Sequence, residues 1–133
     1  MDSDPEKPNF TRAWRDDLEI VEAKKLTENT ARAVYRFPVR QEYLNPAGGL
    51  HGGAAATFHD IGTSVVLNLI SRPGFWSTAG TTRTLNMTYL RPAMKGEILL
   101  LDCEVRKNRE HQREKRVLTV MCRLCTLGRA YAC

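Results

Sequence analysis

A glycine-rich stretch from Asn45 to Gly53 holds the residues best suited to chemistry in this chain. It reads NPAGGLHGG, and the alanine-rich sequence after it predicts a helix that begins at His51-Gly52-Gly53. The first backbone N–H groups of a helix have no acceptor within the helix. Since Gly52 and Gly53 lack side chains, a ligand carbonyl could approach these donors, which would stabilise a developing negative charge. The pattern predicts an oxyanion site, with an ordinary glycine-rich turn as the alternative.

The helix expected from Gly53 to about Ile70 has two different faces. A bulky apolar stripe at three- and four-residue spacing predicts its core side: Phe58, Ile61, Val65 and Leu69. The adjoining stripe carries Asp60 among small side chains: Ala56, Thr57, Thr63 and Ser64. No Lys, Arg or Glu is present, although solvated helix faces usually carry them. Asp60 is therefore predicted to be sheltered, either as a reactive group or as a carboxylate bonded to neighbouring hydroxyls.

The composition fits one ordinary domain. A chain of 133 residues, 42% of them hydrophobic, can bury a core without metal or disulfides. We expect a polar N-terminal segment over residues 1–16 and one domain over residues 17–133. No apolar run approaches the roughly 20 residues of a membrane span, and the polar, acidic start does not resemble a signal peptide. These features predict an intracellular protein.

Four cysteines lie late in the chain: Cys103, Cys122, Cys125 and Cys133. Cys122 and Cys125 have the spacing of a redox or zinc pair, but they fall within a run, residues 117–125, that predicts a strand. Residues three apart on a strand point to opposite faces, so we interpret these cysteines as packing residues. The three histidines show no ligand spacing, and no metal site is expected.

The net charge of +5 raises the question of nucleic acid. The excess is local: residues 106–116 contain six Arg or Lys against Glu110 and Glu114. This basic stretch separates two strand-like runs and predicts a hairpin tip. No aromatic residue interleaves the charges, so the pattern favours a solvated hairpin or a phosphate-bearing small molecule over nucleic acid.

The order of elements predicts an α+β fold, with one long helix packed on a single antiparallel sheet. A short helix is expected at about residues 9–17, and strands at residues 18–24, 31–39, 79–89, 97–107, 114–126 and from 129 onward. Within the third run, one side carries Thr82, Thr84, Asn86 and Thr88. This side is either the wall of a polar pocket or the solvated face of a strand.

The loop, Asp60 and the later sequence NMTYLRPA over residues 86–93 together resemble the hotdog-fold acyl-CoA thioesterases of the phenylacetate-degradation and thioesterase-superfamily type. The resemblance runs from about Leu18 to the end of the chain. It implies a hotdog fold, in which an antiparallel sheet wraps a long central helix. It also implies an acyl-CoA substrate, no cofactor, and active sites at the interface of a homodimer or homotetramer. The implied location is cytoplasmic, with mitochondrial association as an alternative.

Carried over position by position, the resemblance makes Asp60 the nucleophile or the general base toward water. Asn45 would help to hold the thioester and the water. The Gly52 N–H would polarise the thioester carbonyl, and His51 would support that donor.

Three further positions belong to the implied site. Thr82 stands where relatives have a serine that positions the water, so the hydroxyl is kept and a methyl group is added. Gly53 and Arg91 are the expected substrate contacts. The departure at Thr82 bears on the rate and the choice of substrate, and the acyl group itself is left open between fatty and aromatic.

Other functions account for fewer of these residues. A non-catalytic acyl-CoA-binding hotdog protein would not need Asn45, Gly52, Asp60 and a hydroxyl at 82 together. A dehydratase or hydratase of this fold would pair a carboxylate with a histidine, but His59 and Asp60 are adjacent on the helix and point about 100° apart. A nucleic-acid-binding module rests on the basic stretch alone.

Overall fold

The computed structural model describes residues 10–77, 80–106 and 119–127. Its elements are α1 (Arg12–Asp17), β1 (Glu19–Thr27), β2 (Thr30–Pro38), the 3-10 turn η1 (Gln41–Tyr43), α2 (Gly52–Leu67), β3 (Ile98–Arg106) and β4 (Thr119–Thr126). The short N-terminal helix, the first two strands and the long helix agree with the sequence prediction. The later strands β3 and β4 agree with it over the residues described.

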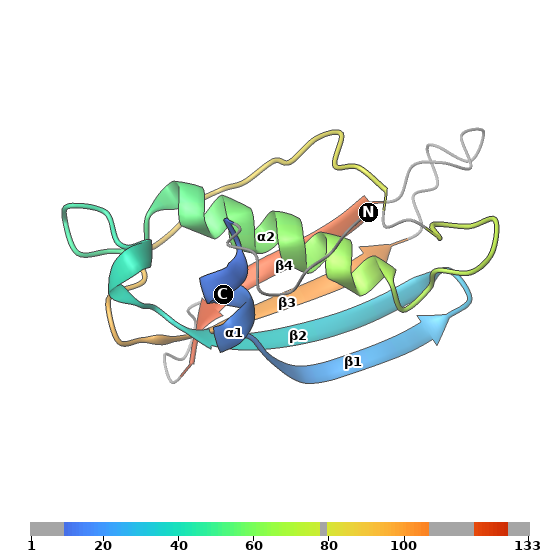
Figure 1. Cartoon of the computed structure of the whole chain (residues 1–133), viewed down its shortest axis with the longest axis horizontal. Coiled ribbons are helices and arrows are strands. Elements are labelled where there is room, and N and C mark those ends of the chain that lie inside the picture. Colours follow the sequence, from blue (N-terminus) through green and yellow to red (C-terminus); the bar gives the residue numbers. More distant parts are fainter. Residues whose placement is uncertain (1–9, 78–79, 107–118, 128–133) are drawn as a thin grey trace.

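The sheet has the strand order β1-β2-β3-β4, and all three pairings are antiparallel. Tyr35 on β2 lies opposite Leu101 on β3, which in turn lies opposite Leu124 on β4. Residues directly opposite each other share one face of a sheet. That face carries α2, which lies across the strands (Figure 1). The predicted α+β architecture, one long helix on an antiparallel sheet, is confirmed.

The helix α2 approaches the sheet closely at Gly62. A Cβ atom added to Gly62 would lie 2.6 Å from Cδ2 of Leu101 and 3.1 Å from Sγ of Cys103. The Tyr35 hydroxyl donates a hydrogen bond to the Gly62 carbonyl at 3.2 Å, and burial raises the pKa of Tyr35 to about 12. Small residues therefore let the helix sit tightly on the strands.

The structure places the predicted apolar stripe of α2 at one edge of its buried face. The buried positions of α2 are Ala55, Phe58, Gly62, Val66 and Leu67. Of the bulky stripe, only Phe58 is among them, while Ile61, Val65 and Leu69 are half-buried. The buried face is thus centred on Phe58, Gly62 and Val66, and the predicted stripe packs at one side of it, because α2 makes its close contact with the sheet at a glycine and not at a bulky side chain.

The helix α1 joins the core through Trp14. Its ring stacks on Phe58, with centroids 5.3 Å apart, and meets Phe37 edge-on at 5.7 Å. A salt bridge between Asp17 and Arg40 ties the end of α1 to the chain that follows β2. The helix α1 thus covers the end of the core nearest the loop.

The strand expected over residues 79–89 is not formed in the described part of that range. Residues 80–90 are extended but belong to no strand. Leu85, Tyr89 and Leu90 remain 40%, 59% and 78% exposed. An isolated extended segment lacks the neighbouring backbone that completes a ladder, and alternation along the sequence predicts conformation without supplying that partner.

The cysteines also differ from the prediction. Cys103 on β3 lies directly opposite Cys122 on β4, and the two form a disulfide across the strands. Cys122 is therefore not a simple packing residue. Cys125 lies opposite Leu100, on the other face from Cys122, as its spacing predicted.

Several predictions fall outside the described residues. These are most of the basic stretch (residues 107–116), Cys133, and the strand from residue 129 onward. In the chain that the structure does describe, no helix combines the length and apolar character required to cross a membrane.

Candidate active site

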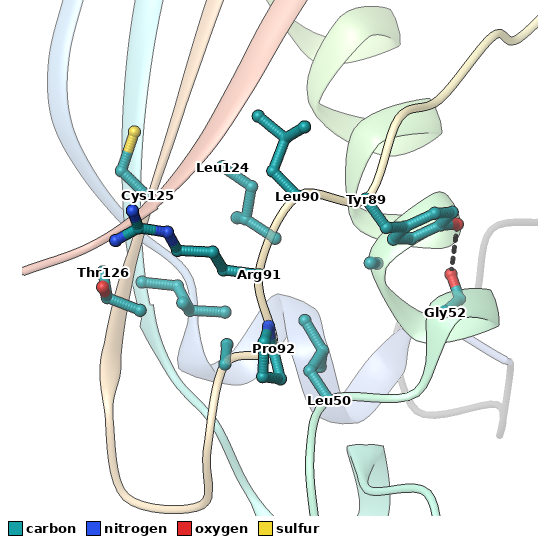
Figure 2. Close-up of a pocket in the computed structure, with 12 residues that line it drawn as sticks. Leu50, Gly52, Tyr89, Leu90, Arg91, Pro92, Leu124, Cys125 and Thr126 are labelled. Atoms are coloured by element: carbon teal, nitrogen blue, oxygen red, sulfur yellow. Dashed lines mark hydrogen bonds between the residues drawn. The ribbon is translucent and has the colours of Figure 1, made fainter. Parts of the chain in front are cut away.

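A pocket of about 410 Å³ lies between the first turn of α2, the chain from Tyr89 to Ala93, and the ends of β3 and β4 (Figure 2). Its lining is mainly apolar: Leu50, Gly52, Ala55, Tyr89, Leu90, Arg91, Pro92, Ala93, Leu99, Leu124, Cys125 and Thr126. A cavity of this size, with few polar groups, suits a small organic ligand or an acyl group.

Backbone hydrogen bonds set the loop that leads into α2. The His51 N–H donates to the Tyr43 carbonyl at 2.7 Å, and the Leu50 N–H donates to the Ala93 carbonyl at 2.7 Å. Tyr43 is itself fixed, since its ring packs edge-on against Phe58 in the core at 5.1 Å. The loop therefore delivers His51 and the glycines after it to a defined place.

His51 caps the start of α2. Its Nδ1 atom accepts a hydrogen bond from the Gly53 N–H at 2.9 Å. This bond leaves the neighbouring Gly52 N–H, at the first residue of the helix, without an acceptor in the described part of the chain. A donor of this kind, at the positive end of a helix and at the edge of a pocket, can bind a carbonyl oxygen or an oxyanion.

Asn45 organises the loop before His51. Its side-chain Oδ1 accepts hydrogen bonds from the N–H groups of Ala47 and Gly49, at 3.0 and 3.1 Å. Its backbone N–H donates to the Gly49 carbonyl at 2.8 Å. The amide oxygen is thus engaged in the turn, and the amide nitrogen is the part of Asn45 that a ligand could use.

Asp60 lies further along α2, on the face that carries the small side chains. The Thr82 hydroxyl donates to Asp60 Oδ1 at 2.5 Å. The hydroxyls of Thr63 and Ser64 instead donate to the Asp60 backbone carbonyl, each at 2.8 Å. The structure therefore brings the half-buried carboxylate into contact with the predicted water-positioning hydroxyl, which is exposed.

Gly52 and Asp60 are too far apart to act on one thioester within a single chain. They are eight residues apart on one helix, which at about 1.5 Å per residue separates them by about 12 Å along its axis. A reacting carbonyl needs its oxyanion donor and its attacking group within about 3–3.5 Å of the bond that changes. Within one chain, therefore, the Gly52 N–H and the Asp60 carboxylate do not reach the same carbonyl group.

The two expected substrate contacts, Gly53 and Arg91, belong to different segments of the chain. Gly53 is in the first turn of α2, with its N–H already bonded to His51. Arg91 lines the pocket, and its side chain points toward Cys125 and Thr126 of β4 (Figure 2). The described lining of the pocket thus combines apolar side chains with the guanidinium group of Arg91.

Sequence reasoning assigned no role to Tyr89. Its hydroxyl donates to the Gly52 carbonyl at 2.9 Å, and its ring lies against Gly52. The signal was available, since Tyr89 belongs to the 86–93 sequence that carries the family resemblance. Spacing alone could not show that it meets a glycine 37 positions earlier.

His59 is engaged separately from its neighbour Asp60. Its Nδ1 bonds to the Ala55 carbonyl at 2.8 Å, which requires a proton on that nitrogen. Burial lowers the pKa of His59, and so favours the neutral ring. Within the residues described, no group of three or more His, Cys, Asp or Glu side chains could hold a metal ion.

An antiparallel sheet on one long helix is also the architecture of solved thioesterase-family proteins. Zebrafish thioesterase superfamily member 2 superposes with a TM-score of 0.63, over 92% of this chain and 89% of that chain, at 23% identity. A phenylacetic acid degradation-related protein from Ralstonia eutropha superposes with a TM-score of 0.68, over 93% and 85%, at 24% identity. The fold is the hotdog fold.

The sequence places the chain more narrowly. A family model of the thioesterase superfamily matches residues 47–130, and the chain belongs to that family. It is also 30% identical to human acyl-coenzyme A thioesterase 13 over 76 residues, which are 57% of this chain and 51% of that protein. The match therefore spans about half the length of that relative.

Proposed function

We propose that the protein hydrolyses an acyl-CoA thioester to a free acid and CoA. The observation that carries the proposal is the carboxylate of Asp60, held at 2.5 Å by Thr82 on a helix that begins with two glycines. Membership of the thioesterase superfamily and the likeness to an acyl-coenzyme A thioesterase support the same reaction. A fatty or an aromatic acyl group would satisfy the apolar pocket.

In this mechanism the thioester carbonyl accepts a hydrogen bond from the Gly52 N–H. Asp60 takes a proton from a water molecule held by Thr82, and the resulting hydroxide attacks the carbonyl carbon. The Gly52 N–H stabilises the oxyanion of the tetrahedral intermediate. When this intermediate collapses the carbon–sulfur bond breaks, and the CoA thiolate leaves and takes up the proton that Asp60 removed from water. In the alternative route Asp60 attacks the carbonyl itself, and water hydrolyses the acyl-enzyme anhydride that forms.

The reaction requires two copies of the chain. Because about 12 Å of helix separates Gly52 from Asp60, the donor of one subunit would meet the carboxylate of another. Among the described strands β4 lies at the edge of the sheet, and most of residues 80–90 are exposed, so these regions offer a surface for that partner. We therefore propose a homodimer or a dimer of dimers.

A panel of short, long and aromatic acyl-CoAs, followed by release of free thiol, tests the reaction. We expect turnover of at least one class, with saturation kinetics. Binding of acyl-CoA without hydrolysis across the whole panel would instead support the non-catalytic alternative. The carboxylate–histidine pairing of a dehydratase is disfavoured, since His59 bonds to Ala55 and Asp60 to Thr82.

Light scattering of the purified protein tests the assembly. A mass of two or four chains is expected in the active fraction. Full activity in a species of monomer mass would refute a site shared between subunits. The cytoplasmic location remains a prediction.

A further inference from the structure

Both polar atoms of the peptide group between Gly52 and Gly53 are held by side chains. The carbonyl oxygen of Gly52 accepts from the Tyr89 hydroxyl at 2.9 Å, and the N–H of Gly53 donates to His51 Nδ1 at 2.9 Å. Figure 2 shows the Tyr89 ring lying beside the first turn of α2, with its hydroxyl pointing at Gly52. Two bonds at opposite ends of one peptide fix its plane.

The ring of Tyr89 adds a steric contact. A Cβ atom added to Gly52 would lie 3.6 Å from Cζ and Oη of Tyr89, and 3.7 Å from Cε1. The ring therefore covers the side of Gly52 where a side chain would otherwise stand. Two successive glycines have the largest backbone freedom of any pair, so the first turn of α2 depends on such outside contacts for a fixed orientation.

The segment that carries Tyr89 also carries Thr82. Over residues 82–89 the chain runs beside α2, and it bonds to Asp60 at one end and to Gly52 at the other (Figure 1). A single extended segment is thus attached to both chemical groups of the helix. Neither attachment uses a backbone ladder.

We infer that Tyr89 is a positioning residue: its hydroxyl and ring hold the Gly52-Gly53 turn so that the Gly52 N–H points at the thioester carbonyl. Tyr89 acts through Gly52 and has no direct part in the bond changes. The inference rests on the proposed hydrolysis for its effect on rate, but the geometry it describes can be measured without any reaction.

The kinetic test compares Tyr89→Phe with the parent on the acyl-CoA that the parent turns over best. Phenylalanine keeps the ring and removes the hydroxyl bond. We expect kcat to fall about 2- to 10-fold, the effect of one hydrogen bond, with KM within about twofold. Ser71→Ala is the matched control, because the Ser71 hydroxyl also donates to an exposed backbone carbonyl, that of Asn68, beyond the other end of α2. This control should keep the parent kcat.

The geometric test uses protein labelled with 15N-glycine. In Tyr89→Phe the amide signals of Gly52 and Gly53 should shift and their hydrogen exchange should accelerate, while those of Gly74 and Gly96 stay in place. Unchanged Gly52 and Gly53 signals would overturn the positioning role, whether or not kcat falls. A lower kcat with unchanged glycine signals would mean that the Tyr89 hydroxyl contacts the substrate directly. A parent kcat in an active Tyr89→Phe protein would also overturn it. If the parent hydrolyses no thioester, the proposed function fails and the glycine signals still decide this inference.

Discussion

The sheet and the segment over residues 80–90 are held in opposite ways. Each pair of neighbouring strands is joined by an antiparallel ladder, and Tyr35, Leu99 and Leu101 on the helix-facing side are under 2% exposed. Residues 80–90 form no strand, and Tyr89 is 59% exposed. This segment nevertheless contacts both Asp60 and Gly52 through side-chain hydroxyls.

The core between α2 and the sheet stabilises the fold, whereas the segment over residues 80–90 contacts the groups proposed to react. Burial of large apolar side chains between α2 and the sheet supplies most of the free energy of folding. Exposed hydroxyl bonds contribute about 0.5–1.5 kcal/mol each, yet they orient the groups proposed to react. Substitutions on the segment should therefore change kinetics with little effect on unfolding, and substitutions under α2 should do the reverse.

The largest effect is expected from Asp60→Asn. The substitution keeps the volume and removes the negative charge that proton abstraction or attack requires. Turnover should fall by roughly 10²- to 10⁴-fold, while the thermal unfolding midpoint stays near that of the parent, because the side chain is only half-buried. Thiol release and calorimetry measure the two quantities. Near-normal turnover in a folded Asp60→Asn protein would refute the mechanism and favour an acyl-CoA-binding role.

The opposite result is expected from Gly62→Ala. The new methyl group would meet Leu101 and Cys103, both fully buried, so overpacking of about 1–3 kcal/mol exceeds the gain of up to about 1 kcal/mol in helix propensity. We expect a net loss of about 1–2 kcal/mol in the free energy of unfolding, measured by urea denaturation. The loss should shrink in a Leu101→Val background, which removes the clashing Cδ2 atom. An equal loss in both backgrounds would contradict the packing explanation.

The same contrast explains what the sequence could predict. The order of elements, the long helix and the start of that helix at His51-Gly52 follow from local composition, because turns and helix starts are set by neighbouring residues. Asp60 was assigned correctly to a face of small side chains, since i, i+3 and i+4 spacing fixes which residues are neighbours on a helix.

Features that depend on distant parts of the chain were missed or misplaced. The close approach at Gly62 determines which face of α2 meets the sheet. The register that places Cys103 opposite Cys122 determines the disulfide. The ladder expected for residues 79–89 needs a partner strand, and alternation carries no information on one. The contact between Tyr89 and Gly52 joins residues 37 positions apart, which no local pattern reports.

Two substitutions of Thr82 test what a single hydroxyl of the 80–90 segment contributes to the reaction. If the hydroxyl positions water beside Asp60, Thr82→Ser should keep most of the activity. Thr82→Val keeps the branched shape but loses a bond worth about 0.5–1.5 kcal/mol, so it should slow hydrolysis by up to about tenfold. Both variants should unfold like the parent, since Thr82 is exposed.

The acyl-CoA panel separates this role from acyl selection. If the methyl group of Thr82 shapes the acyl site instead, Thr82→Ser would change the ranking of substrates and Thr82→Val would behave like the parent. Identical profiles for all three proteins would remove residue 82 from the site.

The smallest expected effect is on the pH dependence of stability, and it arises from His59 on α2. Burial lowers its pKa in the folded chain, whereas the unfolded chain titrates near the usual 6.5. Below pH 6.5, and down to the lower pKa of the folded chain, the unfolded state binds more protons than the folded state. Stability should therefore be full above pH 6.5 and should decline as the pH falls through this window. His59→Gln removes this titration but keeps a side-chain N–H donor. The other histidines are common to both proteins. The urea midpoints of parent and variant should therefore converge or cross between pH 8 and pH 5. A difference in midpoint that stays constant over that range would show that His59 is not held neutral by the fold.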